Sequence, residues 1–321
     1  MKYFITGGAG FVGSHFVDKL ISKNHNVVVY DNLILGKKEN IKEHFKNSKF
    51  TFINGDILNL SKLKKSMKGK DVVIHLAANS DIIKSSKDPD VDLKNGTVGT
   101  YNVLESMREN KIRKIIFTSS NVVYGEVKKL PISENFGPLF PISFYGASKL
   151  ASEALISAYC HNYNIQSWIF RFANVIGKRA THGVVVDFYN KLKKNNRELL
   201  VLGDGNQEKP YILVDDIVSG IFWSFKEAKE SVNYFNLGTK GATKVKVIAK
   251  EVIKAIGLKK VKIIYSGGKR GWPGDVSKVS LDSSKIIDLG YKFLTLDSTK
   301  ACISGIKQII NDLKLKDQSK S

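Results

Sequence analysis

Two residues that can act together on a proton stand four positions apart in the chain. Tyr145 and Lys149 fall within a stretch with a helical pattern, so both side chains are expected on one face. Tyrosine is a poor base at neutral pH because its ordinary pKa is about 10. A nearby positive charge favours the phenolate and lowers that pKa, so Tyr145 could remove the proton of a substrate hydroxyl. The alternative is an ordinary helical pair, because this spacing is also common by chance.

A cluster of hydroxyl residues precedes this pair. Thr118, Ser119 and Ser120 stand at the end of an apolar run that we interpret as a strand. A hydroxyl at that position can hydrogen-bond a reacting oxygen and help to pass the proton. A serine-rich strand end is the structural alternative, but the combination with Tyr145 and Lys149 is less common than any of its parts.

A glycine-rich turn lies near the start of the chain. Gly7, Gly10 and Gly13 follow the first apolar run and open a helical pattern. Glycine allows a tight turn and lets the backbone approach a pyrophosphate, and the helix then offers free amides and a favourable dipole. A glycine loop alone is a weak signal, but its position between a strand and a helix strengthens the prediction of a dinucleotide site.

Acidic residues at the ends of the next two strands refine this prediction. Asp31 ends the second apolar run, where a carboxylate can accept hydrogen bonds from adenosine ribose hydroxyls. Because Asp31 would repel a 2′-phosphate, NAD is favoured over NADP. Asp56 follows the next run and could accept a hydrogen bond from the adenine amine. Both could instead be plain turn residues. His75 ends the fourth strand, and we interpret it as a packed core histidine rather than a catalyst.

Continuous apolar runs alternate with helical patterns over the first half of the chain, which is typical of a parallel sheet covered on both faces. We expect strands at Lys2–Thr6, Val27–Tyr30, Phe50–Asn54, Asp71–Leu76, Lys114–Ser119 and Gln166–Phe170. We expect helices at Phe11–Lys23, Asp90–Asn110 and Ser143–His161. This order predicts a doubly wound, Rossmann-like α/β fold, whose ligands bind at the carboxyl ends of the strands.

The pattern loosens after residue 172. Short strands mix with helices that we expect at Val184–Asn195, Val214–Lys229 and Lys246–Ile256. We therefore divide the chain into an NAD-binding Rossmann-like domain, 1–172, and a smaller C-terminal substrate-binding lobe, 173–321. Segments of the second part can return to the first domain.

Composition fits a globular protein. Of the 321 residues, 42% are hydrophobic and 25% charged, so the core needs no metal or disulfide to hold it. Two distant cysteines, no signal peptide and no membrane-length apolar stretch favour the cytoplasm. The net charge of +21 could attract nucleic acid, but aromatic residues do not interleave with the lysines, so we expect no nucleic-acid partner and no membrane insertion. No metal site is expected.

Taken together, these motifs resemble the extended short-chain dehydrogenase/reductase superfamily, and within it the UDP-glucose 4-epimerase branch of nucleotide-sugar enzymes. The resemblance spans nearly the whole chain. The matching segments are Thr6–Gly13, Tyr30–Leu33, Gly55–Asp56, His75–Ala78, Ser119–Gly125, Tyr145–Lys149, Arg171–Gly177, Leu202–Gly205 and Val214–Asp216.

The resemblance implies roles for individual residues. Ser120, Tyr145 and Lys149 would form the catalytic triad, with Lys149 also holding the nicotinamide ribose. NAD would be bound by Gly7, Gly10, Phe11, Val12, Gly13, Asp31, Asn32, Asp56, Ile57, Ala77, Ala78, Tyr145 and Lys149. The nucleotide sugar would be bound by Ser80, Asn174, Val184, Lys209 and Arg270. Helices near 90–110 and 143–161 resemble those of a four-helix dimer interface, which implies a homodimer.

Three departures from the family pattern bear on the reaction. Dehydratases of the superfamily carry Asp-Glu after the catalytic hydroxyl residue, whereas this chain has Asn121 and Val122, which disfavours dehydration. Lys209 replaces a usual arginine and can meet a phosphate only as a point charge. The loop 270–275 is longer than the usual arginine-containing loop, so the identity of the sugar and of the nucleotide base stays undecided.

We therefore expect NAD-dependent oxidation at C4 of a nucleotide-diphosphate sugar, as in a 4-epimerase of the UDP-glucose/UDP-galactose type. One alternative is an NAD-dependent 4-dehydrogenase that releases a 4-keto sugar, for example of a GDP-linked heptose in surface polysaccharide synthesis. Another is a non-catalytic NAD-binding regulator or RNA-binding protein, against which the intact set of Ser120, Tyr145 and Lys149 argues.

Overall fold

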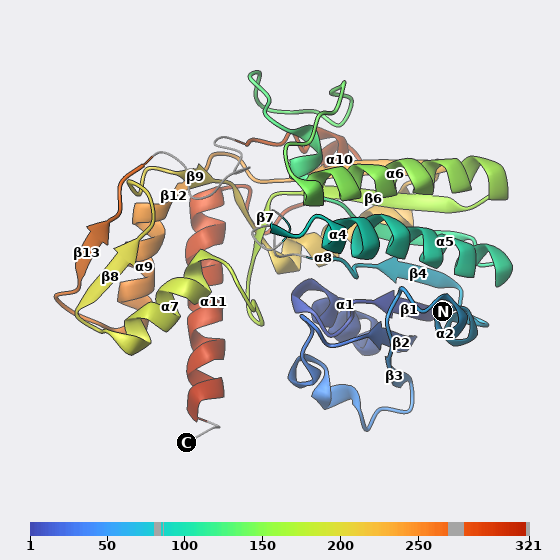
Figure 1. The fold of residues 1–321 in the computed structure, drawn as a ribbon, viewed down its shortest axis with the longest axis horizontal. Helices are drawn as coiled ribbons and strands as arrows, with labels where there is room; N and C mark the ends of the chain where they lie inside the picture. Colours follow the sequence, from blue (N-terminus) through green and yellow to red (C-terminus); the bar gives the residue numbers. More distant parts are fainter. Residues whose placement is uncertain (80–84, 86, 269–278, 319–321) are drawn as a thin grey trace.

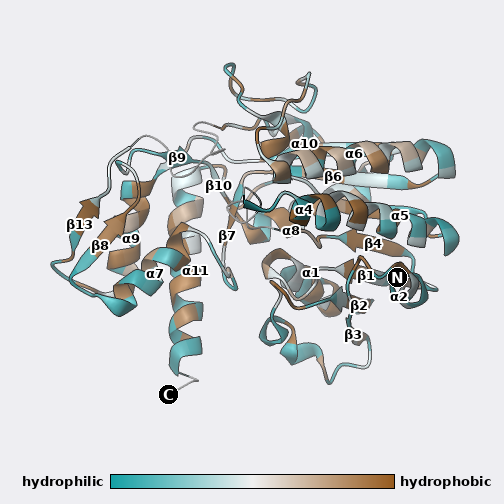
Figure 2. Cartoon of the chain, viewed as in Figure 1, coloured by the Kyte–Doolittle hydropathy of each residue, from teal (hydrophilic) through white to brown (hydrophobic). Residues whose placement is uncertain are grey.

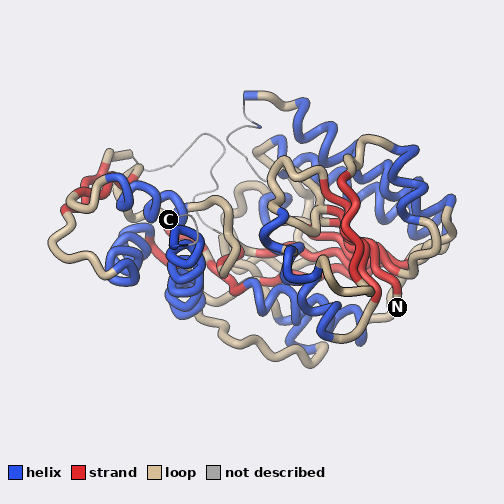
Figure 3. The backbone as a smooth tube through the Cα atoms, turned by 90° about the horizontal axis from the view of Figure 1, so that it is seen from below, coloured by secondary structure: helices blue, strands red, loops and turns tan. Residues whose placement is uncertain are grey.

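The computed structural model describes residues 1–79, 85, 87–268 and 279–318. Its centre is a seven-stranded sheet in which every pair of neighbours is parallel (Figures 1 and 3). Across the sheet the strands run in the order β11 (Val232–Leu237), β6 (Gln166–Phe172), β5 (Lys114–Thr118), β4 (Val72–His75), β1 (Lys2–Thr6), β2 (Asn26–Asp31) and β3 (Phe50–Asn54). The doubly wound parallel α/β fold that the sequence predicted is thereby confirmed.

Helices cover both faces of this sheet, as Figure 3 shows. One face packs against α1 (Phe11–Ser22) and α8 (Val214–Glu227), which contribute Phe16, Leu20, Ile217 and Ile221 to one buried cluster. The other face packs against α2 (Leu60–Met67), α5 (Gly99–Glu109) and α6 (Phe144–Tyr163). The strands are apolar on both sides because both sides are covered, and Figure 2 shows teal, hydrophilic residues mainly on the outer surfaces.

The long helix expected over Asp90–Asn110 is present but not uniform. It begins with α4 (Asp90–Asp92), widens into a π-helical turn, η3 (Leu93–Val98), and continues as α5. Gly96, inside this turn, packs directly on the next helix: a Cβ added there would lie 2.5 Å from the Ser148 hydroxyl oxygen of α6. Such turns are rare and often lie at functional sites.

The remaining elements form a smaller lobe, on the left in Figure 1. Helices α7 (Val184–Lys194), α9 (Val245–Ile256) and α11 (Ser298–Gln318) share a separate apolar cluster. Short strands join in three pairs: β7 (Asn174–Ile176) with β10 (Tyr211–Leu213), β8 (Glu198–Val201) with β13 (Lys262–Tyr265), and β9 (Glu208–Lys209) with β12 (Thr243–Lys244). Short helical segments complete the fold: η1 (Lys38–Asn40), η2 (Lys42–His44), η4 (Asn121–Tyr124) and α10 (Ser284–Asp288).

The chain crosses between the two parts more than once. After β7 and α7 it returns through α8 to β11, which pairs with β6 at the edge of the central sheet. The expected division at residue 172 therefore stays a prediction, with the strand Val232–Leu237 as a segment that returns to the sheet. In the part of the chain that the structure describes, no helix is both long enough and apolar enough to cross a membrane.

Candidate active site

The turn between β1 and α1 holds the backbone close to the neighbouring strand. Gly7 has a φ of +71°, which glycine adopts without strain, and a Cβ there would lie 2.8 Å from the Ala77 amide nitrogen. A Cβ on Gly13 would lie 2.3 Å from the Gly7 carbonyl oxygen. Only glycine fits at these two positions, so no side chain covers the backbone of the turn at them, and a ligand can approach it closely.

The first turn of α1 is open to an anion. Gly10 begins the helix without a side-chain cap among the described residues, and Phe11 and Val12 follow it half-buried. Amide groups in the first turn of a helix have no partner within the helix, and the dipole adds positive potential there. This bare turn and its free amides fit the pyrophosphate of a dinucleotide.

The acidic residues at or just beyond the ends of the second and third strands lie at the same corner of the sheet, joined through Asn32. Asp31 is 7% exposed, and its carboxylate accepts hydrogen bonds from the amides of Ala9 and Leu33, each at 2.9 Å. Burial raises the pKa of Asp31, and these two amides act against the rise. The Asn32 amide donates to Asp56 at 3.0 Å. Each carboxylate oxygen can accept a second hydrogen bond, so this corner fits the adenosine end of NAD.

Residues at the end of β4 and beyond β3 line the same edge of the sheet. Ala77 and Ala78 are half-buried, and Ile57 is 5% exposed. His75 lies in the interior, where its ring nitrogens lie 2.7 Å from the Thr6 hydroxyl oxygen and 3.1 Å from that of Thr100. Burial lowers the pKa of His75 to about 3, so it stays neutral and acts as a structural residue.

Ser120 begins the short helix η4 at the carboxyl end of β5. Its hydroxyl oxygen accepts a hydrogen bond from the Val122 amide at 3.4 Å, and its side chain is half-buried. The start of α6 packs on this segment, because a Cβ on Gly146 would lie 2.9 Å from the Val122 carbonyl oxygen. The fold therefore brings η4 and the first turn of α6 together, which places Ser120 and Tyr145 on two segments in contact.

Lys149 is held in the interior beneath Tyr145. Its side chain is 3% exposed, its ammonium donates to the Thr118 carbonyl at 2.7 Å, and its Nζ lies 5.7 Å from the centre of the Tyr145 ring. Burial lowers the pKa of Lys149 to about 8, while the carboxylates of Glu153 and Asp92 act in the opposite direction. Lys149 is thus a desolvated ammonium beside a phenol.

The surroundings of Tyr145 in the protein alone favour its neutral phenol. Burial raises the pKa of its phenol, and the Asp92 carboxylate raises it further. The expectation of a lowered pKa rested on nearby positive charge, that of Lys149 and that of the nicotinamide ring of bound NAD, and it stays a prediction for the NAD-bound protein. In the protein alone, the loss of solvent penalises the phenolate. The Tyr145 proton therefore leaves readily only when additional positive charge lies beside the phenol.

A buried network behind this pair was not expected from the sequence. The Ser119 hydroxyl donates to Glu153 at 2.5 Å, and Arg171 forms an ion pair with Glu153 at the same distance. Arg171 also donates to the Tyr124 hydroxyl at 3.0 Å. The signal was present, since Glu153 stands four residues after Lys149 on one helix face. This network ties α6 to β6 and to the strand end that carries Ser120.

The expected substrate-binding residues are distributed over the smaller lobe. Asn174 is exposed at the start of β7, Val184 begins α7, and Lys209 is half-buried in β9. The structure does not show these three converging on one point. Ser80 and Arg270 lie outside the described residues.

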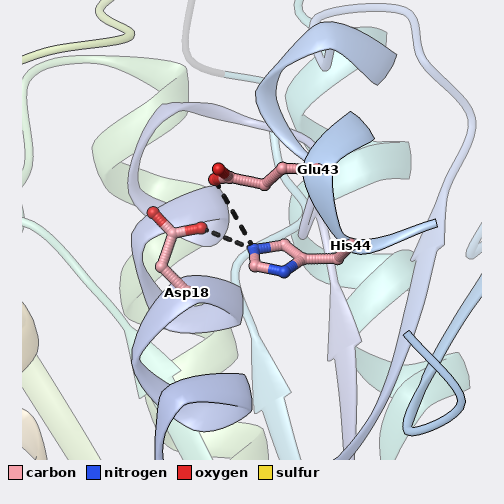
Figure 4. Close-up of side chains that lie close together, drawn as sticks. All are labelled: Asp18, Glu43 and His44. Carbon is pink, nitrogen blue, oxygen red and sulfur yellow. Dashed lines mark hydrogen bonds and ion pairs between the residues drawn. The ribbon is translucent and has the colours of Figure 1, made fainter. Parts of the chain in front are cut away.

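A second cluster of ionisable residues lies at the side of α1. Figure 4 shows the carboxylates of Asp18 and Glu43 directed at the His44 ring, whose Nε2 lies 2.8 Å and 3.7 Å from them. Arg179 donates to both carboxylates, at 2.7 Å and 2.9 Å. Because this guanidinium already supplies the positive charge, the cluster is an ion-pair network that joins α1, η2 and the loop after β7, and it does not suit a metal cation.

Comparisons with known proteins agree with this geometry. A family model described as the NAD dependent epimerase/dehydratase family matches residues 3–238. A putative UDP-glucose 4-epimerase of Methanocaldococcus jannaschii is 37% identical over 316 residues, 97% of each chain. A crystal structure of UDP-galactose 4-epimerase matches with a TM-score of 0.86 and 33% identity over 98% of this chain and 99% of that one.

A further solved structure widens the range of substrates among the relatives. The UDP-glucuronic acid 4-epimerase of Bacillus cereus, in complex with UDP-glucuronic acid and NAD, matches with a TM-score of 0.87 and 30% identity, over 98% of this chain and 100% of that one. The superfamily that the motifs predicted is confirmed, and with it an enzyme that uses NAD. The chain belongs to the NAD-dependent epimerase/dehydratase family.

Proposed function

We propose that the protein is a nucleotide-sugar 4-epimerase of the UDP-glucose/UDP-galactose type. The observation that carries the proposal is that Ser120, Tyr145 and Lys149 lie at the carboxyl edge of the same sheet that carries the glycine turn of α1. The similarity to 4-epimerases over nearly the whole chain supports it. NAD, held by the glycine turn and by Asp31, would supply the hydride acceptor of the reaction.

The residues of the chain would handle the proton of the reaction. Tyr145, as the phenolate, would take the proton of the sugar 4-hydroxyl and become a neutral phenol, while Ser120 would hydrogen-bond the same sugar oxygen and relay the proton. Lys149 stabilises the phenolate through its ammonium. The 4-keto sugar then turns over in the site, and Tyr145 returns the proton as hydride is added to the opposite face of C4. Atoms and electrons balance, because the sugar loses and regains one hydride and one proton.

The smaller lobe would hold the nucleotide end of the substrate. We assign the diphosphate to Asn174, with Lys209 as a further positive charge, and the base to the start of α7 at Val184. Lys209 is a point charge rather than a planar fork, so it can meet a phosphate without fixing its orientation. Asn121 and Val122 follow Ser120 where a carboxylate pair would be needed to eliminate water, which favours epimerisation over dehydration.

The test is anaerobic mixing of the full chain, loaded with NAD, with a panel of UDP- and GDP-linked sugars. The absorbance of reduced nicotinamide is followed, and the sugar products are identified by chromatography and NMR. The proposal expects the 4-epimer of a UDP-hexose with little lasting reduced cofactor. Lasting reduced cofactor with a released 4-keto sugar would instead establish a net 4-dehydrogenase. No conversion of any UDP-sugar would refute the epimerase assignment.

We also infer that the chain forms a homodimer through the helices 90–109 and 144–163. Large apolar side chains are exposed along the first of these, with Leu93 56%, Val98 40% and Tyr101 44% exposed. Apolar side chains gathered on one helix face commonly mark an interface. Light scattering should give twice the mass of one chain, and Tyr101→Glu should shift the protein toward monomer. A wild-type protein that is monomeric at micromolar concentration would contradict this inference.

A further inference from the structure

Asp92 is a buried carboxylate that none of the assignments above uses. It ends α4, and its residue is 1% exposed. One carboxylate oxygen, Oδ1, accepts a hydrogen bond from the Asn79 amide at 3.1 Å, whereas Oδ2 is buried without a hydrogen-bond partner among the described residues. A buried charge is costly unless another charge or a hydrogen bond compensates it. Asp92 therefore requires an electrostatic partner.

The packing of the helices supplies that partner. One turn after Asp92, Gly96 lies against α6, where the Ser152 hydroxyl donates to its carbonyl at 3.3 Å and a Cβ would meet the Ser148 hydroxyl oxygen at 2.5 Å. The helices follow neighbouring parallel strands, β4 and β5, and therefore run in the same direction. One turn before Ser148 on α6 stands Tyr145. The face of α4 that carries Asp92 is thus directed at the catalytic pair.

The charges around Lys149 single out Asp92. On α6 itself Lys149 faces Glu153, but that carboxylate is held by Arg171 in an ion pair at 2.5 Å. On β4 it faces His75, which burial keeps neutral. Asp92, from α4, acts on both Lys149 and Tyr145 and raises the pKa of each. Among the described residues, Asp92 is the carboxylate near the pair that no arginine or lysine holds in a salt bridge.

We propose, on the basis of the function proposed above, that Asp92 is a positioning residue whose carboxylate is the counter-charge of the Tyr145–Lys149 pair. It keeps the buried Lys149 ammonium charged at neutral pH and opposes loss of the Tyr145 proton until a positively charged ligand is in place. In this way it sets the pH range in which the pair works. Its action passes through the two catalytic residues and not through contact with substrate.

The decisive variant is Asp92→Asn. Asparagine has nearly the same shape and keeps an oxygen that can accept from Asn79, so the packing is retained. Removing one negative charge should lower the pKa of Lys149 and of Tyr145 together, each by about one unit. With NAD and substrate bound, the acid limb of the pH–rate profile, set by Tyr145, and the alkaline limb, set by Lys149, should therefore both move to lower pH. A purely structural defect would lower the maximum without moving the limbs.

A second readout requires no turnover. NMR titration of the full chain with NAD bound, labelled with ¹³C at lysine Cε and assigned with Lys149→Arg, reports the Lys149 proton directly. The Lys149 signal should titrate about one unit lower in Asp92→Asn than in wild type. Should that variant fail to fold, Asp92→Ser should show the same shift, whereas Asp92→Glu, which keeps the charge, should titrate as wild type does.

The matched control is Asp90→Asn, two residues before Asp92, which removes an exposed carboxylate that pairs with Lys94. It should leave the Lys149 titration and both limbs unchanged. If Lys149 titrates alike in wild type and Asp92→Asn, the inference is wrong even where activity falls. This titration is measured without substrate. An inactive wild-type enzyme would therefore refute the proposed function, while the Lys149 titration would still test the role of Asp92.

Discussion

Burial acts in opposite senses on the two residues that define the catalytic pair. It raises the pKa of Tyr145 and lowers that of Lys149 to about 8, because in both cases the charged form loses solvation. As pH rises through about 8, Lys149 loses the proton that lets it stabilise a phenolate. The pair therefore loses its stabilising ammonium above about pH 8, and Tyr145 can act as a base only from its phenolate form, which positive charge beside the phenol favours.

Tyr145→Phe removes the group that accepts the proton and leaves the ring that packs at the start of α6. We expect kcat for epimerisation to fall by about 10²- to 10⁴-fold, the usual contribution of a positioned acid–base group. A product assay and urea unfolding measure the two effects separately. The control is Tyr163→Phe, on the same helix with a 42% exposed side chain, which should keep full activity. A Tyr145→Phe enzyme with wild-type activity would exclude Tyr145 as the base.

At the scale of the elements, α6 is the helix that sets the site. It begins at Ser143, whose hydroxyl oxygen accepts from the Gly146 amide at 3.0 Å, and it carries Tyr145, Lys149 and Glu153 along one face. The last of these three is held to β6 by Arg171. The position of α6 against the sheet thus depends on a buried ion pair. The close packing of the turn before α1 depends instead on glycine.

Glu153→Gln should show how much α6 relies on this ion pair. Both partners are nearly buried, so the change leaves the Arg171 charge without compensation, and the free energy of unfolding should fall by about 3–5 kcal/mol. Urea denaturation measures the loss. In the control, Asp187→Asn breaks the exposed pair with Lys191 on α7 and should cost about 0–1 kcal/mol. Equal losses in the two variants would contradict the assigned role.

Gly13→Ala should test how much the glycine turn contributes to NAD binding. The added Cβ would lie 2.3 Å from the Gly7 carbonyl oxygen, so α1 must shift away from the turn that carries the free amides. We expect the Kd for NAD, measured by calorimetry, to rise at least about tenfold, or about 1.4 kcal/mol. Gly137→Ala is the control, because a Cβ there meets no atom within 4 Å. Unchanged NAD affinity in Gly13→Ala would speak against binding at this turn.

At the scale of the whole molecule, the chain forms two packed parts, each with its own apolar cluster. The central sheet carries the glycine turn and the catalytic pair, and the smaller lobe has an apolar core of its own. The loop after β7 reaches back to α1 through Arg179, which is 14% exposed at its side chain and contacts Asp18 and Glu43. This ion-pair network is one of the links that fix the loop relative to the sheet.

Arg179→Met should loosen that link while keeping much of the apolar stem. We expect a several-fold rise in KM for the nucleotide sugar with kcat nearly unchanged, and a loss of about 1–2 kcal/mol in the free energy of unfolding, between exposed and buried pairs. Steady-state kinetics and urea unfolding measure these. Lys178→Met, at the exposed neighbouring position, is the control. A large fall in kcat with unchanged KM would show that the loop serves the chemistry instead.

Much of this architecture is readable from the chain, but some elements are not. The six strands expected in the first half all occur, five of them within one residue at each end, because continuous apolar runs mark strands buried on both faces. Strand β11 was not expected, because Asn233 and Asn236 interrupt its apolar pattern. Both are buried and satisfied by hydrogen bonds, such as the 2.8 Å contact of Asn236 with the Tyr124 hydroxyl. Such partners exist only after folding.

The sequence by itself determined what depends on local order: the strand–turn–helix of the glycine loop, the acidic strand ends, and the shared helix face of Tyr145 and Lys149. Neighbouring residues and helical periodicity suffice for these. Only the tertiary structure decided the electrostatics of the pair. Asp92 belongs to a different helix, and burial, which raises the pKa of Tyr145, is a property of all the packed elements together. Desolvation and charges brought from distant parts of the chain have no signature in local spacing.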